Sequence, residues 1–265
     1  MPTVAVNGAV LHYEERGDGP PVLFLHGTGA SSFIWDRTVP LLPVGRRLIT
    51  YDRRGFGDSA GDGARSLQEH ADDAAALLRA LGATPAAVVT QSGGAPIALR
   101  LTIGHPDLVS DLVMAEPAYQ VLLHPSLSVS RAMAKTLVRW LVLRDPAGAA
   151  VAYYRWASRF TTGGNAYDGY PDEWRTTAIR HARATLREVL QLIPPGPRAG
   201  AVREISCPVT LLIGDISEPV FQRTTRRVQR LMPGARLVRV SGTSHLIPAD
   251  QPEAFAKAVA DALTI

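Results

Sequence analysis

The chain has 265 residues, of which 46% are hydrophobic and 20% are charged, a balance typical of a globular protein with a sizeable core. Its single cysteine, Cys207, excludes an internal disulfide and a thiol cluster for zinc or iron–sulfur. The formal net charge of +4 comes mainly from arginines spread along the chain, which favours solvated helix surfaces, so we expect no nucleic-acid partner.

The N-terminal residues MPTVAVNGAV contain no basic segment followed by an apolar one, which argues against a secretion signal. No uninterrupted apolar stretch approaches the roughly 18–20 residues that a membrane-spanning helix needs. We therefore expect a cytoplasmic protein without a membrane partner. The sequence does not indicate an oligomeric state.

Short apolar runs alternate with longer helical patterns along most of the chain. Residues 3–17 predict a hairpin that turns at Asn7-Gly8. Continuous apolar runs, typical of strands covered on both faces, occupy 22–27, 47–52, 86–91, 111–116, 208–214 and 235–240. Helical spacing is found at 66–82, 95–104 and 252–263. This order predicts an α/β fold with a doubly wound, mostly parallel sheet.

One interval departs from this alternation. Residues 120–200 contain no good strand, but helical patterns occur at 128–143, 147–160 and 173–193. Because this block falls between two sheet strands, we expect a helical cap over one edge of the sheet. The cap would be inserted into a core formed by residues 1–119 and 201–265.

Ligands of open parallel sheets bind at the carboxyl ends of the strands. The segments that follow the predicted strands are HGTG (26–29), DRRGFGDS (52–59), QSGGA (91–95), AEPAY (115–119), GDISEP (214–219) and SGTSHLIP (241–248). Together they supply a serine, several carboxylates and a histidine, which are the parts of an acyl-transfer site.

These landmarks in this order resemble the α/β-hydrolase superfamily, in its single-chain serine-hydrolase form with a helical cap, over essentially the whole chain. The matching stretches are HGTG, YDRRGFGDS, the turn around Ser92, HPDLVSDLVMAEP and GTSHLIPADQPEAF. The resemblance implies an acyl-enzyme hydrolase of a carboxylic ester or lactone that uses no cofactor and no metal. Thioesterases, carbon–carbon bond hydrolases, cofactor-free perhydrolases and non-hydrolytic receptors share the scaffold and remain alternatives.

Carried over by position, the resemblance makes Ser92 the nucleophile and His245 the general base. The usual turn is G-x-S-x-G, whereas this chain has Thr90 in place of the first glycine. The backbone N–H groups of Thr28 and Gly93 would form the oxyanion hole. A serine at the nucleophile position argues against haloalkane dehalogenase and epoxide hydrolase chemistry, which need a carboxylate there.

The acid of the triad is open among three residues. Most relatives have an aspartate three residues after the glycine that ends the strand at 208–214, but here that position is Ser217. Asp215 and Glu218 lie beside it. Glu116, at the end of the strand that follows the nucleophile's, corresponds to the position used by other relatives, and the longer reach of glutamate suits it. We favour Glu116.

Three cap aromatics, Trp140, Tyr154 and Trp156, are candidates for contact with an apolar substrate. Packing inside the cap is the commoner use of such residues and is kept as the alternative. The chain has no G-x-G-x-x-G or Walker-type loop, which disfavours a nucleotide cofactor. The substrate is therefore expected to be a small, apolar molecule.

Overall fold

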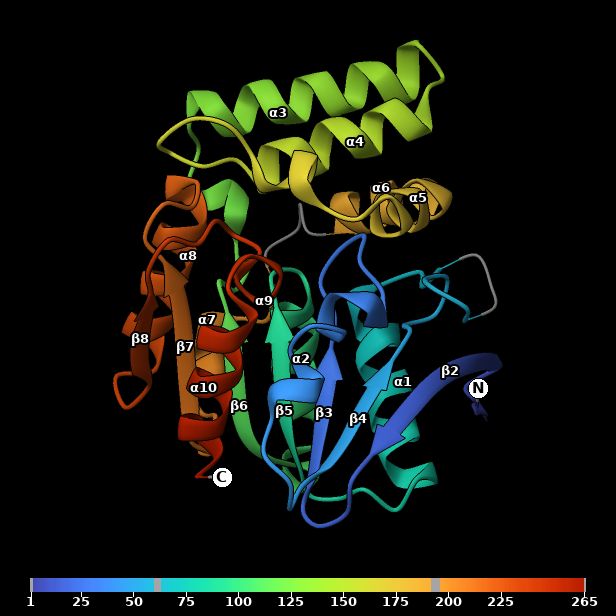
Figure 1. Cartoon of the computed structure of the whole chain (residues 1–265), viewed down its shortest axis with the longest axis vertical. Coiled ribbons are helices and arrows are strands. Elements are labelled where there is room, and N and C mark those ends of the chain that lie inside the picture. The colour runs from blue at the N-terminus through green and yellow to red at the C-terminus, as the bar shows by residue number, and fades with distance from the viewer. Residues whose placement is uncertain (1, 60–62, 192–195, 265) are drawn as a thin grey trace.

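The computed structural model describes residues 2–59, 63–191 and 196–264. Its eight strands form one sheet in the order β1-β2-β4-β3-β5-β6-β7-β8 (Figure 1). Only the pairs β1–β2 and β2–β4 are antiparallel. The strands are β1 Thr3–Val6, β2 Ala9–Arg16, β3 Pro21–Leu25, β4 Arg47–Tyr51, β5 Ala86–Gln91, β6 Val109–Ala115, β7 Val209–Gly214 and β8 Arg236–Val240. The predicted mostly parallel sheet is confirmed.

The N-terminal hairpin turns where the sequence predicted. Asn7 and Gly8 both have positive φ angles, 48° and 74°, as a two-residue turn between antiparallel strands requires. The turn fixes the register in which Val6 faces Ala9, so that both side chains join the core beneath β2.

Helices cover both faces of the sheet, which explains why the central strands are apolar at every position. One core cluster lies between the sheet and α1 (Leu67–Ala80), α2 (Gly94–Gly104), α7 (Ala199–Arg203) and α8 (Pro219–Leu231). The other lies under α9 (Ile247–Asp250) and α10 (Pro252–Leu263). All six residues of β5 and all six of β7 are buried. This two-sided burial holds the carboxyl ends of β5, β6 and β7 side by side.

The helices between residues 127 and 191 lie beyond the carboxyl ends of the strands (Figure 1), and we call residues 120–200 the cap. They are α3 Leu127–Leu137, the π-helical turn η5 Val138–Val142, α4 Pro146–Ala157, α5 Asp172–Arg180 and α6 Ala182–Gln191. The single helix predicted over 173–193 is wrong: it is two helices that part at His181, and residues 192–193 lie outside the described part. Short 3₁₀ turns occupy Ser32–Trp35, Val39–Leu41, Pro106–Leu108, Val121–Leu123 and Ala166–Gly169.

None of the described helices combines the length and the apolar composition required to cross a membrane. The lone Cys207 is half-buried, and burial raises the pKa of its thiol to about 11. The thiol is therefore protonated at neutral pH, as suits a packing residue.

Candidate active site

Ser92 occupies a sharp turn between β5 and α2. Its φ angle is 53°, in the left-handed region that a residue with a side chain rarely adopts. The Ser92 N–H donates to the Ala115 carbonyl of β6 at 2.9 Å, which ties the strained turn to the neighbouring strand. Strain of this kind persists only where surrounding contacts hold it, and it is concentrated at functional sites.

The structure explains how this turn accepts Thr90 where glycine is usual. The Thr90 hydroxyl donates to the Leu25 carbonyl of the adjacent strand β3 at 2.8 Å, so this buried hydroxyl has a hydrogen-bond partner. A Cβ on Gly94 would collide with that hydroxyl and lie 2.8 Å from the Leu25 carbonyl oxygen. The glycine at 94 therefore provides the space that the threonine side chain occupies.

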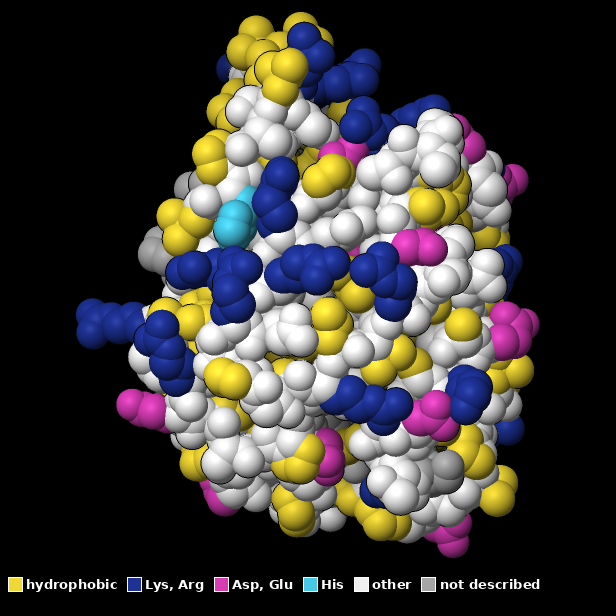
Figure 2. Space-filling view, turned by 90° about the vertical axis from the view of Figure 1, so that its left-hand side faces the viewer, with side chains coloured by type: hydrophobic (Ala, Val, Ile, Leu, Met, Phe, Trp, Pro, Cys, Tyr) yellow, Lys and Arg dark blue, Asp and Glu magenta, His cyan; other side chains and the backbone are white. Residues whose placement is uncertain are grey.

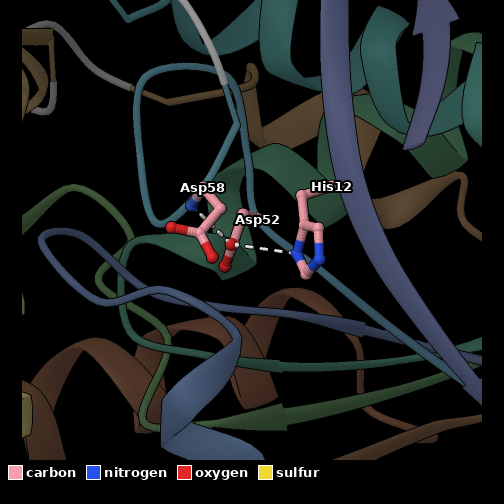
Figure 3. A group of neighbouring side chains, drawn as sticks. All are labelled: His12, Asp52 and Asp58. Carbon is pink, nitrogen blue, oxygen red and sulfur yellow. Dashed lines mark hydrogen bonds and ion pairs between the residues drawn. The ribbon is translucent and has the colours of Figure 1, made fainter. Parts of the chain in front are cut away.

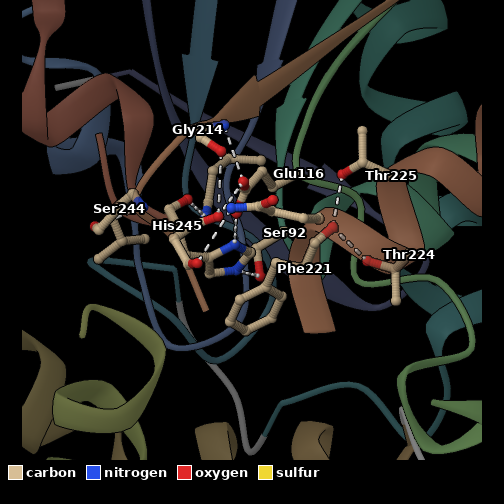
Figure 4. Close-up of polar contacts among 12 residues, drawn as sticks. Ser92, Glu116, Gly214, Phe221, Thr224, Thr225, Ser244 and His245 are labelled. Atoms are coloured by element: carbon tan, nitrogen blue, oxygen red, sulfur yellow. Dashed lines mark hydrogen bonds and ion pairs between the residues drawn. The ribbon is translucent and has the colours of Figure 1, made fainter. Parts of the chain in front are cut away.

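Ser92, His245 and Glu116 form a continuous hydrogen-bonded chain (Figure 4). His245 Nε2 lies 2.6 Å from Ser92 Oγ, and His245 Nδ1 lies 2.9 Å from Glu116 Oε2. All three side chains are almost entirely buried. Glu116 follows the last residue of β6, and the imidazole bridges residues that lie far apart in the sequence.

The other two carboxylates are held elsewhere. Glu218 pairs with Arg159 at 2.5 Å and accepts from Ser128 Oγ at 3.0 Å. The Asp215 carboxylate accepts from the Gly242 N–H at 2.7 Å. Neither contacts the His245 ring.

Ser217, at the position where most relatives have the aspartate, donates to Glu116 Oε1 at 2.6 Å. The Gly214 N–H donates to the same oxygen at 2.9 Å. One carboxylate oxygen thus takes two donors, and the other is left for the imidazole.

Several groups that the sequence did not single out hold His245. The Phe221 ring of α8 stacks on the imidazole, with ring centroids 3.4 Å apart and planes at 10° (Figure 4). Gln91 Nε2 donates to the His245 carbonyl at 3.1 Å. The Asp250 carboxylate accepts from the Ser244 N–H at 2.7 Å, and burial raises the pKa of Asp250 to about 6.

The loop after β3 brings Thr28 against the turn that carries Ser92. A Cβ on Gly93 would lie 3.2 Å from the Thr28 nitrogen, so the two backbone N–H groups are neighbours. Among the described residues neither N–H has a hydrogen-bond acceptor. His26 anchors the loop: its Nε2 accepts from the Arg53 N–H at 3.0 Å, and burial lowers the pKa of the ring well below its ordinary value, which keeps that nitrogen unprotonated.

A buried ion pair joins the cap to this loop. Glu188 of α6 pairs with Arg53 at 2.8 Å, and its other oxygen accepts from Thr28 Oγ1 at 2.6 Å. Arg53 also donates to the Gly27 carbonyl at 2.9 Å. Sequence reasoning missed Glu188. A carboxylate beside Val189 on the buried face of α6 was the available signal.

A cavity whose lining includes six aromatic side chains reaches Ser92 and His245. Tyr154, predicted to contact substrate, lines it, and its hydroxyl donates to the Gly29 carbonyl at 2.8 Å. Trp140 and Trp156 do not line it, so their assignment to the pocket is corrected: Trp156 packs against Phe221 instead. The aromatic lining consists of Phe33, Tyr153, Tyr154, Tyr167, Tyr170 and Trp174.

Outside this site, His12, Asp52 and Asp58 lie close enough together to be considered as metal ligands (Figure 3). The two Asp52 carboxylate oxygens accept the Ser32 N–H at 2.7 Å and the Asp58 N–H at 2.8 Å. His12 Nδ1 lies 3.4 Å from Asp52. These hydrogen bonds hold Asp52 against the backbone of its own loop and of the loop after β3.

Comparison with known proteins agrees with this architecture. A family model described as "Alpha/beta hydrolase family" matches residues 22–258. BpoC of Mycobacterium tuberculosis, named for a non-heme bromoperoxidase, is 31% identical over 252 residues, which are 92% of this chain and 94% of BpoC.

Two solved structures share the fold. A thermophilic esterase from Thermogutta terrifontis matches with a TM-score of 0.79 and 23% identity over 99% of this chain and 96% of the esterase. The enol-lactonase of Burkholderia xenovorans LB400 matches with a TM-score of 0.72 and 20% identity over the whole of both chains. The chain belongs to the α/β-hydrolase family.

Proposed function

We propose that this protein is a serine hydrolase that cleaves a small, apolar carboxylic ester or lactone through an acyl-enzyme. The observation that carries the proposal is the chain of two hydrogen bonds, 2.6 and 2.9 Å, that links Ser92 through His245 to Glu116. A nucleophile, a base and an orienting acid within bonding distance are what acyl transfer requires.

In the first half-reaction, Ser92 Oγ attacks the substrate carbonyl and its proton passes to His245 Nε2. Glu116 stabilises the imidazolium, and the N–H groups of Thr28 and Gly93 bind the oxyanion. The carbon–oxygen bond to the leaving group then breaks, and the alkoxide takes the proton from Nε2. An alcohol, or the opened hydroxyl end of a lactone, is produced along with the acyl-enzyme.

In the second half-reaction, water replaces the leaving group. His245 removes a proton from the water, the resulting hydroxide attacks the acyl carbon, and the ester bond to Ser92 breaks. The serine oxygen recovers the proton from Nε2, and the carboxylic acid leaves. No step uses a group other than the side chains and N–H groups named.

The cavity supports an apolar substrate. Its lining includes six aromatic side chains, and residues 120–200 contribute five of these six. We propose that residues 120–200 act as a lid that sets substrate choice, with Tyr154 and Glu188 as its contacts to the loop of Thr28. Apolar pockets of this kind bind through buried area and use few polar groups for orientation.

A cofactor-free perhydrolase is the second candidate, because BpoC is named for a bromoperoxidase. Perhydrolysis would use the same acyl-enzyme, with hydrogen peroxide replacing water and a peracid replacing the acid. Supplying peroxide to the purified protein and measuring peracid separates it from hydrolysis.

The test is covalent labelling of Ser92 by a fluorophosphonate. The wild type should gain one adduct, located on the peptide that contains Ser92, whereas Ser92→Ala should gain none while it keeps its circular dichroism spectrum. A panel of nitrophenyl esters, lactones and acyl thioesters then ranks the substrate classes by kcat/KM. Labelling of Ser92→Ala at the wild-type rate, or no labelling of the wild type, would refute the proposal.

A further inference from the structure

The outer end of the cap carries an exposed apolar cluster that neither the active site nor the cap's own core uses. Val138, Leu141, Val142 and Leu143 have exposed fractions of 49–70%. They lie within the π-helical turn and the link to α4. We call residues 138–144 the cap tip. In Figure 1 the link between α3 and α4 projects beyond the other cap helices.

Such a cluster is unusual on a surface that faces only water. Of the twelve exposed large hydrophobic side chains among the described residues, four fall between positions 138 and 143. Contiguous exposed apolar patches mark sites of interaction, whereas apolar residues scattered singly do not. The tip therefore indicates a contact with something outside this chain.

The charge around the tip identifies the kind of partner. Residues 125–160 contain six Arg or Lys side chains and one acidic residue, Asp145, a net charge of +5. Because the whole chain has 28 basic and 24 acidic side chains, the remainder carries a net charge of −1. Two of these six, Arg155 and Arg159, pair with Asp168 and Glu218, which leaves Arg131, Lys135, Arg139 and Arg144 as the basic side chains close to the tip.

The basic side chains lie next to the apolar ones. Arg131, Lys135 and Arg139 follow at intervals of four along the helix and so share one of its faces, and Arg144 directly follows Leu143. Only Arg139 of these four has an ion-pair partner among the described residues, Asp145 at 2.9 Å. Figure 2 shows hydrophobic and basic side chains together at the cap end of the molecule.

We propose that the cap tip docks on an anionic lipid surface. The aliphatic side chains and Trp140 would enter the boundary between head groups and acyl chains, and the basic residues would contact the phosphates. A second copy of this chain is the other apolar partner to consider, but it would bring two sets of these four basic side chains together. Surface docking of this kind needs no membrane-spanning helix, and it does not depend on the proposed hydrolase activity.

The test is sedimentation of the full-length protein with vesicles. The wild type should bind phosphatidylcholine vesicles that contain phosphatidylglycerol and bind phosphatidylcholine alone far more weakly. Binding should weaken as salt rises, because the Debye length falls from about 10 Å at 0.1 M to about 3 Å at 1 M. Replacing Arg131, Lys135 and Arg144 by glutamine should weaken binding about 100-fold, at about fivefold per charge.

The apolar part is tested with Leu141→Ser/Val142→Ser/Leu143→Ser, which should lose binding at least about tenfold. The matched control is Leu41→Ser/Val44→Ser, which changes exposed apolar residues of the core domain and should bind like the wild type. Both variants should keep the wild-type thermal midpoint, because all five side chains are exposed.

Three results would overturn the proposal. The first is that the wild type does not sediment with anionic vesicles. The second is that the tip variant binds as well as the wild type, and the third is that the control variant loses as much binding as the tip variant. Light scattering distinguishes the other partner: a dimer that the tip variant abolishes, without vesicle binding, would assign the tip to a second copy of the chain.

Discussion

Replacing Glu116 by glutamine should nearly abolish turnover, and the hydrogen bonds around it explain why. Glu116 Oε1 accepts from the Ser217 hydroxyl at 2.6 Å and from the Gly214 N–H at 2.9 Å. In Glu116→Gln the amide oxygen must take this position, because the Gly214 N–H can only donate and an amide NH₂ cannot accept from it. The NH₂ group is then directed at His245 Nδ1.

With the NH₂ group in that orientation, the two nitrogens of the His245 ring exchange their donor and acceptor roles. Nδ1 must accept from the NH₂ group, so the proton moves to Nε2, which faces Ser92 Oγ. An Nε2 that carries a proton cannot take another from the serine. Loss of the correct tautomer in a serine triad lowers kcat by about 10⁴, equivalent to about 5.4 kcal/mol of activation free energy. Every partner in the variant stays hydrogen-bonded, so the free energy of unfolding should change by less than about 1.5 kcal/mol.

The assay is kcat and kcat/KM on the best ester or lactone at neutral pH, with urea denaturation of the same preparations. Glu218→Gln is the control, because Glu218 pairs with Arg159 and does not contact His245; it should lose about tenfold or less. Glu116→Gln with more than a tenth of wild-type turnover would refute the tautomer argument. A loss equal to that of Glu218→Gln would refute Glu116 as the acid.

Three further outcomes are expected. Glu116→Ser/Ser217→Asp should regain about tenfold or more over Glu116→Gln, since Ser217 Oγ lies 2.6 Å from the carboxylate it would replace; no recovery would show that an acid at 217 cannot reach His245. Glu188→Gln leaves buried Arg53 without its counter-charge, so urea denaturation should show a loss of about 3 kcal/mol, and unchanged stability would contradict the buried pair. Burial raises the pKa of Asp250 from 3.8 to about 6, so the folded protein favours the protonated carboxyl. The stabilisation that this proton gives to the folded state is complete below pH 4 and is lost as the pH rises through 6. Between pH 4 and pH 7 the wild type should therefore lose about 2 kcal/mol relative to Asp250→Asn, and parallel stability curves for the two proteins would contradict the raised pKa.

Local patterns in the sequence were enough to predict the strands of the core and its helices α1, α2 and α10, but not α8. The continuous apolar runs at 86–91 and 208–214 required strands covered on both faces, and Asn7-Gly8 required a tight hairpin turn. These properties depend on residues adjacent in the chain, so no tertiary information was needed. The segment 173–193 shows the limit, because its periodicity continues past His181 although the helix does not.

Ser92 and His245 were predictable as a pair for a related reason. Each follows a strand, and the carboxyl ends of parallel strands meet at one edge of the sheet. Their positions after these strands therefore implied that they lie close together, and in the structure His245 Nε2 lies 2.6 Å from Ser92 Oγ.

Only the tertiary structure distinguished the three carboxylates. All three follow one of two neighbouring strands: Glu116 follows β6, and Asp215 and Glu218 follow β7. The sequence therefore places each of them near the site. Which one reaches His245 depends on the direction of a side chain, and Arg159 and Gly242 hold the other two away. The same holds for the cap: Glu188 accepts a hydrogen bond from Thr28, whereas Trp140 and Trp156 do not line the cavity. Composition and periodicity identify which residues are available, but contacts across 98 to 160 positions are decided by how packed elements orient their side chains.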